Sequence, residues 1–126
     1  MYRKLFTKII ATPRYLKRLS IVWGILIWVL CLMPSNELPK TSPIPQLDKI
    51  VHFTLYLGWS VLVLLTLSLY KRRFNAAFIL FLLLLCSLLI ELLQFALPIG
   101  RSFSILDLLA NSAGLLAGWA IFRSLK

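Results

Sequence analysis

The chain has 126 residues, of which 60% are hydrophobic and 14% are charged, and its formal net charge is +10. Soluble domains usually contain about 45–50% apolar and about 25% charged residues, so the composition excludes a disordered acidic tail and a collagen-like or disulfide-stapled chain, and it disfavours a soluble core. The basic excess is typical of proteins that bind nucleic acid or the anionic face of a membrane, and the hydropathy favours the membrane.

Four apolar segments follow one another along the chain. They are residues 20–33, 50–70, 74–97 and 105–122. A membrane-spanning helix needs about 20 mainly apolar residues, so the second and third segments are long enough, while the first and fourth are marginal. No segment alternates with a period of two, which argues against a β-barrel. The sequence therefore predicts an all-α membrane protein with four transmembrane helices in a small bundle.

The basic residues predict the orientation of these helices. In a four-span topology, 11 of the 14 Lys and Arg residues lie on one side: Arg3, Lys4, Lys8, Arg14, Lys17, Arg18, Lys71, Arg72, Arg73, Arg123 and Lys126. Only Lys40, Lys49 and Arg101 lie on the other side. Because short loops rich in Lys and Arg stay in the cytoplasm, we expect both termini inside a bacterial cytoplasmic (inner) membrane.

Residues 1–18 form a basic, partly amphipathic segment before a transmembrane domain of residues 19–126. Apolar residues recur at helical spacing near its start: Tyr2, Leu5, Phe6, Ile9 and Ile10. This pattern predicts a short interfacial helix whose cations meet anionic headgroups, and a basic flank that only sets the topology is the alternative. No A-x-A-like site follows the first apolar segment, so we expect an uncleaved anchor rather than a signal peptide.

The few polar residues of the spans converge on one layer in the outer half of the membrane. A charged side chain at the centre of a membrane helix costs about 2.5–3.5 kcal/mol on insertion scales, and such residues usually mark function. Glu91 has the highest expected insertion cost among them. We interpret the layer as a binding site made of Asp48, Lys49, His52, Tyr56, Glu91, Gln94, Arg101, Ser102, Asp107 and Asn111.

Several of these residues also have a purely structural interpretation. Asp48 and Asp107 lie near expected helix starts, where a carboxylate interacts favourably with the helix dipole. Ser104 and Asp107 have the spacing of a capping box. Glu91 could be a structural group that forms a hydrogen bond with Asn111 of another helix. Either interpretation of these residues remains open from the sequence.

Small residues at one position of each turn indicate close helix packing in the fourth span. Gly114 and Gly118 have the spacing that allows membrane helices to approach each other. This pattern is most simply a packing face, and it leaves room for a homodimer through that face.

The sequence has no diagnostic metal motif. Cys31 and Cys86 lie at different depths and have no nearby His, so neither a disulfide nor a zinc site is expected from them. His52 and the carboxylates could form a metal site, but their spacing is not that of any known motif. We therefore expect no metal and no cofactor.

Three blocks of the chain resemble the signatures of VanZ-like membrane proteins. Residues 48–56, DKIVHFTLY, resemble D-K-x-x-H-F-x-x-Y; residues 91–102 resemble E-x-x-Q…P…G-R-S; and residues 107–118 resemble D-x-x-A-N-x-x-G-x-x-x-G. The resemblance extends from about the end of the first span to residue 122. It implies a small multi-pass protein of the cell envelope. The family takes its name from a glycopeptide-resistance protein that protects against teicoplanin, an antibiotic with a lipid tail.

The first functional hypothesis is an outward-facing site that binds or acts on a lipid-linked envelope component or a lipid-tailed antibiotic such as teicoplanin. Arg101 would attract a phosphate or carboxylate, and Glu91, His52 and Asp107 would form hydrogen bonds with the polar head. The second is a membrane-embedded enzyme in which Asp48 orients His52 and Glu91 acts as a general acid or base. The third is a structural or accessory protein without its own ligand.

These hypotheses leave open whether the chain is an enzyme and which residues would be catalytic. The expected partners are membrane lipids, with anionic headgroups at the basic cytoplasmic face, and a lipid-linked envelope precursor. Nucleic acid is not expected, because the basic residues lie on short loops beside the membrane and form no binding motif.

Overall fold

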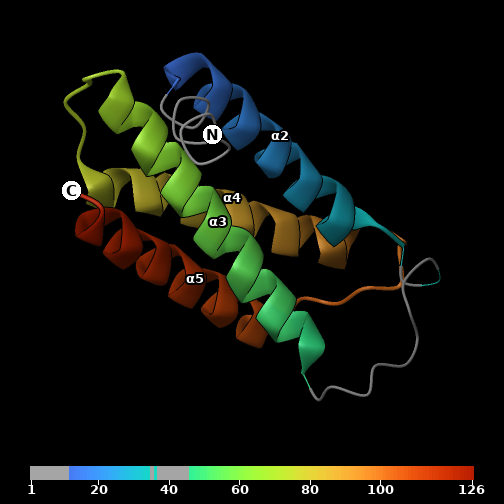
Figure 1. Ribbon diagram of the computed structural model, residues 1–126. Coiled ribbons are helices and arrows are strands. Elements are labelled where there is room, and N and C mark those ends of the chain that lie inside the picture. Colours follow the sequence, from blue (N-terminus) through green and yellow to red (C-terminus); the bar gives the residue numbers. More distant parts are fainter. Residues whose placement is uncertain (1–11, 35, 37–45) are drawn as a thin grey trace.

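The computed structural model describes residues 12–34, 36 and 46–126, and within them the chain forms long α-helices and no strand. The helices are α2 (Pro13–Leu32), α3 (Leu47–Leu69), α4 (Ala76–Ala96) and α5 (Ile105–Ser124) (Figure 1). At about 1.5 Å per residue, each is about 30–35 Å long, close to the thickness of the hydrocarbon core. All four are long and apolar enough to cross a membrane, which confirms the predicted all-α fold with four membrane-spanning helices.

Local signals explain where the helices begin. Pro13 is the first residue of α2, where its fixed φ and missing N–H are compatible with a helix. This helix therefore begins before the apolar stretch and includes part of the expected basic segment. Asn75 caps α4 by accepting a hydrogen bond from the backbone N–H of Ala77 at 2.9 Å. The interfacial helix predicted for residues 2–10 lies outside the described residues.

Successive helices run in opposite directions, so α2 and α4 end where α3 and α5 begin (Figure 1). We call this end of the bundle the site end. The opposite end, which contains residues 70–75 and 123–126, is called the basic end. The most extensive interhelical contact joins α3 and α5, while α2 packs mainly on α3 and α4 mainly on α5. Residues at the starts of α3 and α5 are therefore brought together.

Two glycines allow the close approach of α3 and α5. A Cβ atom added at Gly114 would lie 2.3 Å from the carbonyl oxygen of Phe53, and one added at Gly118 would lie 2.6 Å from that of Leu57. Both distances are shorter than van der Waals contact, so only glycine fits. Because α3 already covers this face of α5, the expectation of a homodimer through it is wrong. A dimer through another face stays a prediction.

Reciprocal tryptophan–glycine contacts join α2 to α3. Trp59 of α3 lies against Gly24 of α2, and Trp23 of α2 lies against Gly58 of α3. Trp23 also donates a hydrogen bond from Nε1 to the carbonyl oxygen of Leu55 at 2.8 Å. An indole N–H without a partner would be costly in an apolar environment, so this bond favours one register of α2 on α3.

We expect Gly114→Ala to destabilise the bundle. Alanine usually stabilises a helix by about 1 kcal/mol relative to glycine. Here its Cβ would collide with the backbone of Phe53, and overpacking of this kind costs about 1–3 kcal/mol. The thermal unfolding midpoint in detergent, followed by circular dichroism, should fall. Ala113→Val adds bulk to an exposed position of α5 and should change it little. An unchanged midpoint in Gly114→Ala would contradict the close contact.

Candidate functional site

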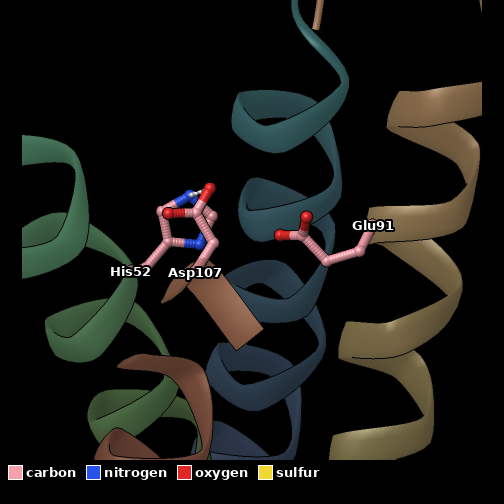
Figure 2. A group of neighbouring side chains, drawn as sticks. All are labelled: His52, Glu91 and Asp107. Carbon is pink, nitrogen blue, oxygen red and sulfur yellow. Dashed lines mark ion pairs between the residues drawn. The ribbon is translucent and has the colours of Figure 1, made fainter. Parts of the chain in front are cut away.

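Three helices supply ionisable side chains to one buried cluster at the site end. His52 of α3, Glu91 of α4 and Asp107 of α5 point toward one another (Figure 2). Their exposed fractions are only 4%, 0% and 7%, and one nitrogen or oxygen atom from each lies within 4.8 Å of the others. We call these three residues the polar triad. All three belong to the layer expected from the sequence.

Asn111 orients the imidazole ring of His52. Its side-chain Nδ2 donates a hydrogen bond to Oγ of Ser87 at 2.7 Å, so its Oδ1 is the atom that faces Nδ1 of His52, at 2.9 Å. Because a carbonyl oxygen can only accept, Nδ1 of His52 carries the proton and donates it. The other ring nitrogen, Nε2, faces Oδ2 of Asp107 at 3.8 Å.

Lys49 connects the polar triad to the surface. Its ammonium group lies 2.5 Å from a carboxylate oxygen of Asp107 and 2.5 Å from one of Asp48, whose side chain is 60% exposed. The predicted role of Asp48 in orienting His52 is therefore wrong, since Asn111 makes that contact. Asp48 lies in the first turn of α3, one turn before His52, where its side chain is exposed at the end of the bundle.

Glu91 ties α4 to the start of α5. The backbone N–H of Ser104 donates to Oε2 of Glu91 at 3.2 Å, and the Ser104 hydroxyl accepts from the backbone N–H of Asp107 at 3.2 Å. In a complete capping box the Asp107 carboxylate would accept the Ser104 N–H. Because Glu91 takes that place, the Asp107 carboxylate is available to Lys49 and His52. Oε1 of Glu91 is buried and has no hydrogen-bond partner among the described residues.

Two other predicted site residues are part of the packing around the polar triad. Gln94 donates a hydrogen bond from Nε2 to the carbonyl oxygen of Cys31 at 2.6 Å, which joins α4 to the last turn of α2. Tyr56 is fully buried, and its ring packs edge-on against Trp59 with 5.9 Å between centroids. The bond of Gln94 joins two helices, whereas the contact between Tyr56 and Trp59 lies within α3.

Arg101 and Ser102 lie in the link between α4 and α5. Gly100 adopts a positive φ of 71° in this link, a conformation that glycine reaches without strain. Ser102 is exposed and Arg101 is partly buried, and neither forms a hydrogen bond or ion pair with a described residue.

Ser87 is a member of the site that the sequence interpretation missed. It is fully buried and accepts the hydrogen bond of Asn111, so Asn111 bonds to Ser87 and not to Glu91 as the structural interpretation of Glu91 expected. A signal was present, because Ser87 precedes Glu91 by four residues and such residues share a helix face. A serine in a membrane helix is so common a residue that this spacing alone did not distinguish it.

The basic end contains a cavity of about 680 Å³. Its described lining includes four cationic side chains and no carboxylate. The ammonium of Lys126 lies 5.0 Å from the ring centroid of Phe122, and the guanidinium of Arg123 lies 5.5 Å from that of Trp119. The four cationic residues are Arg72, Arg73, Arg123 and Lys126.

Comparison with known proteins gives one match. The family model described as VanZ/LLP1 matches residues 5–126, nearly the whole chain. This range includes all three sequence blocks and every residue of the polar triad. No match was found among curated proteins or among solved structures.

We expect Asn111→Ala to destabilise the site end. The substitution would remove hydrogen bonds to two other helices and leave groups of His52 and Ser87 unsatisfied, and each such loss costs about 1–3 kcal/mol. The thermal unfolding midpoint in detergent should fall. Ser112→Ala is the matched control, because Ser112 only donates to Leu108 of its own helix. Equal midpoints for the two variants would contradict the described network.

Proposed function

This chain belongs to the VanZ/LLP1 family, and from that premise we propose that its site end binds the polar head of a lipid-linked cell-envelope component or of a lipid-tailed antibiotic such as teicoplanin. Arg101 is the observation that carries the proposal. Arg101 is a partly buried residue of the link between α4 and α5 at the site end, and it forms no hydrogen bond or ion pair with a described residue. A cation held in this way is available to an anionic ligand.

The chemistry of the site suits a head group with both an anionic group and hydrogen-bond donors. A guanidinium binds phosphate or carboxylate through two parallel hydrogen bonds. Lys49, whose side chain is 24% exposed, adds a second positive charge near the surface. Deeper in the site, the unpartnered Oε1 of Glu91 can accept a hydrogen bond from a hydroxyl or amine of the same head group.

The surface beside the site suits a lipid tail. Phe95 near the end of α4 is 71% exposed, and Ile105 and Leu106 at the start of α5 are 65% and 61% exposed. In a membrane these side chains contact hydrocarbon. A ligand with a long apolar chain could therefore leave the chain in the bilayer while its head group contacts Arg101.

The basic end supports the proposed orientation in a bacterial inner membrane. Positive charge on short loops favours the cytoplasmic side, which would place both termini inside and the polar triad toward the outside.

We further propose that the cavity lined by Arg72, Arg73, Arg123 and Lys126 holds the headgroup of an anionic phospholipid. Each cation near a membrane surface contributes about 1 kcal/mol of attraction to such lipids.

Catalysis is a second candidate function, favoured by the orientation of His52. Asn111 binds one ring nitrogen, so the other is directed into the polar triad and could act in proton transfer. A nucleophilic hydroxyl is harder to assign. The Ser104 hydroxyl already caps α5, and Ser102 is exposed on the link.

We expect Arg101→Gln to weaken binding of a polyprenyl phosphate or of teicoplanin at least tenfold. Hydrogen bonds to charged groups contribute about 1.5–3 kcal/mol, and 1.4 kcal/mol corresponds to a factor of ten. Native mass spectrometry of the purified protein in detergent would measure the binding. Arg14→Gln is the matched control, because Arg14 is an exposed arginine of α2 that does not line the basic cavity, and this variant should bind as the unmodified chain does.

Equal affinity of Arg101→Gln and the unmodified chain for both ligands would contradict the proposed binding site. An equal loss in Arg101→Gln and Arg14→Gln would contradict it as well. The same spectra would show a change in mass of the bound lipid if the site were catalytic.

We expect Arg72→Gln combined with Arg123→Gln to reduce the retention of phosphatidylglycerol through delipidation by about thirtyfold, since two cations contribute about 2 kcal/mol. Native mass spectrometry after transfer from mixed-lipid nanodiscs would count the retained lipids. Arg14→Gln combined with Lys17→Gln is the control, because these exposed cations of α2 do not line the cavity. Equal retention in both double variants would contradict the headgroup site.

A further inference from the structure

We infer that the polar triad is a binding site for a divalent metal ion, with Nε2 of His52 and one carboxylate oxygen each of Glu91 and Asp107 as ligands. Figure 2 shows the three side chains directed toward a common point from three helices. Imidazole and carboxylate are the ligands that Zn²⁺ and Mn²⁺ share. The argument for the site comes from distances, from the hydrogen bond of His52 and from the charges around Glu91.

The distances fit one ion with a small adjustment. Zn–N and Zn–O bonds are about 2.0–2.2 Å long, so two ligands of the same ion are about 3.0–4.2 Å apart. Nε2 of His52 and Oδ2 of Asp107 are 3.8 Å apart, inside this range and longer than a hydrogen bond. All three ligand atoms lie within 4.8 Å of one another, which a change of side-chain torsion in Glu91 could close.

The hydrogen bond of His52 prepares its other nitrogen for a metal. Nδ1 donates its proton to Oδ1 of Asn111 at 2.9 Å, so in the neutral ring Nε2 carries only a lone pair. That lone pair faces Oδ2 of Asp107, which is also an acceptor. Two acceptors repel each other unless a proton or a cation lies between them. Metal-binding histidines usually donate their second ring N–H to a fixed oxygen in this way.

The charges around Glu91 favour a cation as well. Its Oε2 accepts only the backbone N–H of Ser104, its Oε1 has no partner, and none of the ion pairs among the described residues includes it. The nearest ammonium, that of Lys49, already contacts Asp48 and Asp107. A fully buried carboxylate that forms no ion pair is costly in an apolar environment, and a divalent cation would reduce that cost.

The ligand set indicates Zn²⁺ or Mn²⁺ rather than Mg²⁺. Mg²⁺ prefers oxygen ligands and keeps several waters, whereas an imidazole nitrogen suits the transition metals. Three protein ligands also leave a position open, as in catalytic zinc sites. A phosphate oxygen of the head group could occupy it; that last step rests on the proposed function, whereas the metal site itself does not.

The experiment measures metal bound to the purified full-length chain after its affinity tag has been cleaved. The protein is stripped with EDTA, reloaded with Zn²⁺ or Mn²⁺, desalted and analysed by inductively coupled plasma mass spectrometry. We expect one ion per chain. Glu91→Gln and Asp107→Asn should each weaken metal binding at least tenfold, and Asn111→Ala, which alters the support of His52, should weaken it about 10–100-fold.

Ser112→Ala is the matched control, because the Ser112 hydroxyl donates only to Leu108 of its own helix and Ser112 lies outside the polar triad. It should retain one ion per chain. Size-exclusion chromatography and circular dichroism verify that each variant is folded. If a triad variant fails to fold, Co²⁺ bound to the unmodified chain provides a second measurement, since its visible spectrum reports nitrogen and oxygen ligation.

Three results would overturn the inference. They are less than about one-fifth of an ion per unmodified chain, equal losses in Ser112→Ala and Glu91→Gln, or a Co²⁺ spectrum of six-coordinate, water-like ligation. Lipid binding is measured on the same preparations with and without EDTA. Lipid binding that depends on Arg101 and is unchanged by EDTA would contradict only the contact between the head group and the metal. Metal binding without any lipid binding would contradict the proposed function alone.

Discussion

The close contact between α3 and α5 is the constraint on which the site depends. Gly114 and Gly118 have no side chains to separate the two helices, so the first turns of α5 lie directly against the first turns of α3. This approach brings Asn111 to His52 and Asp107 to Lys49. A larger residue at either glycine would separate the partners of both contacts, even though neither glycine touches them.

Glu91 determines how the rest of the site is arranged. The first N–H groups of a helix have no acceptor within the helix and must find one elsewhere. Ser104 satisfies one of these groups, and Glu91, from a different helix, accepts the N–H that the Asp107 carboxylate would otherwise take. The Asp107 carboxylate therefore does not cap its own helix, and it contacts Lys49 and His52 of α3 instead. The contact between Glu91 and Ser104 therefore has two effects. It satisfies a free N–H at the start of α5, and it helps to form the buried cluster of three ionisable groups.

The fold was predictable from the sequence because it depends on local composition. In a membrane every backbone polar group must be satisfied within the segment, so an apolar run of sufficient length becomes a helix. The four spans therefore agree with the helices to within a few residues, and the largest difference, at α2, arises because Pro13 can begin a helix before the apolar stretch does. Helical spacing likewise identified the packing face of Gly114 and Gly118, but not the helix that covers it.

The sequence by itself determined four membrane-spanning helices and the residue types of one polar layer, because both follow from hydropathy and periodicity along a single chain. Only the tertiary structure decided which members of that layer meet. In it, His52 forms its hydrogen bond with Asn111 and not with Asp48, and Ser87 accepts a hydrogen bond from Asn111. His52, Glu91 and Asp107 come together from three helices. No spacing could encode that arrangement, because it results from the rotation and depth of helices that are joined by loops and packed through glycines.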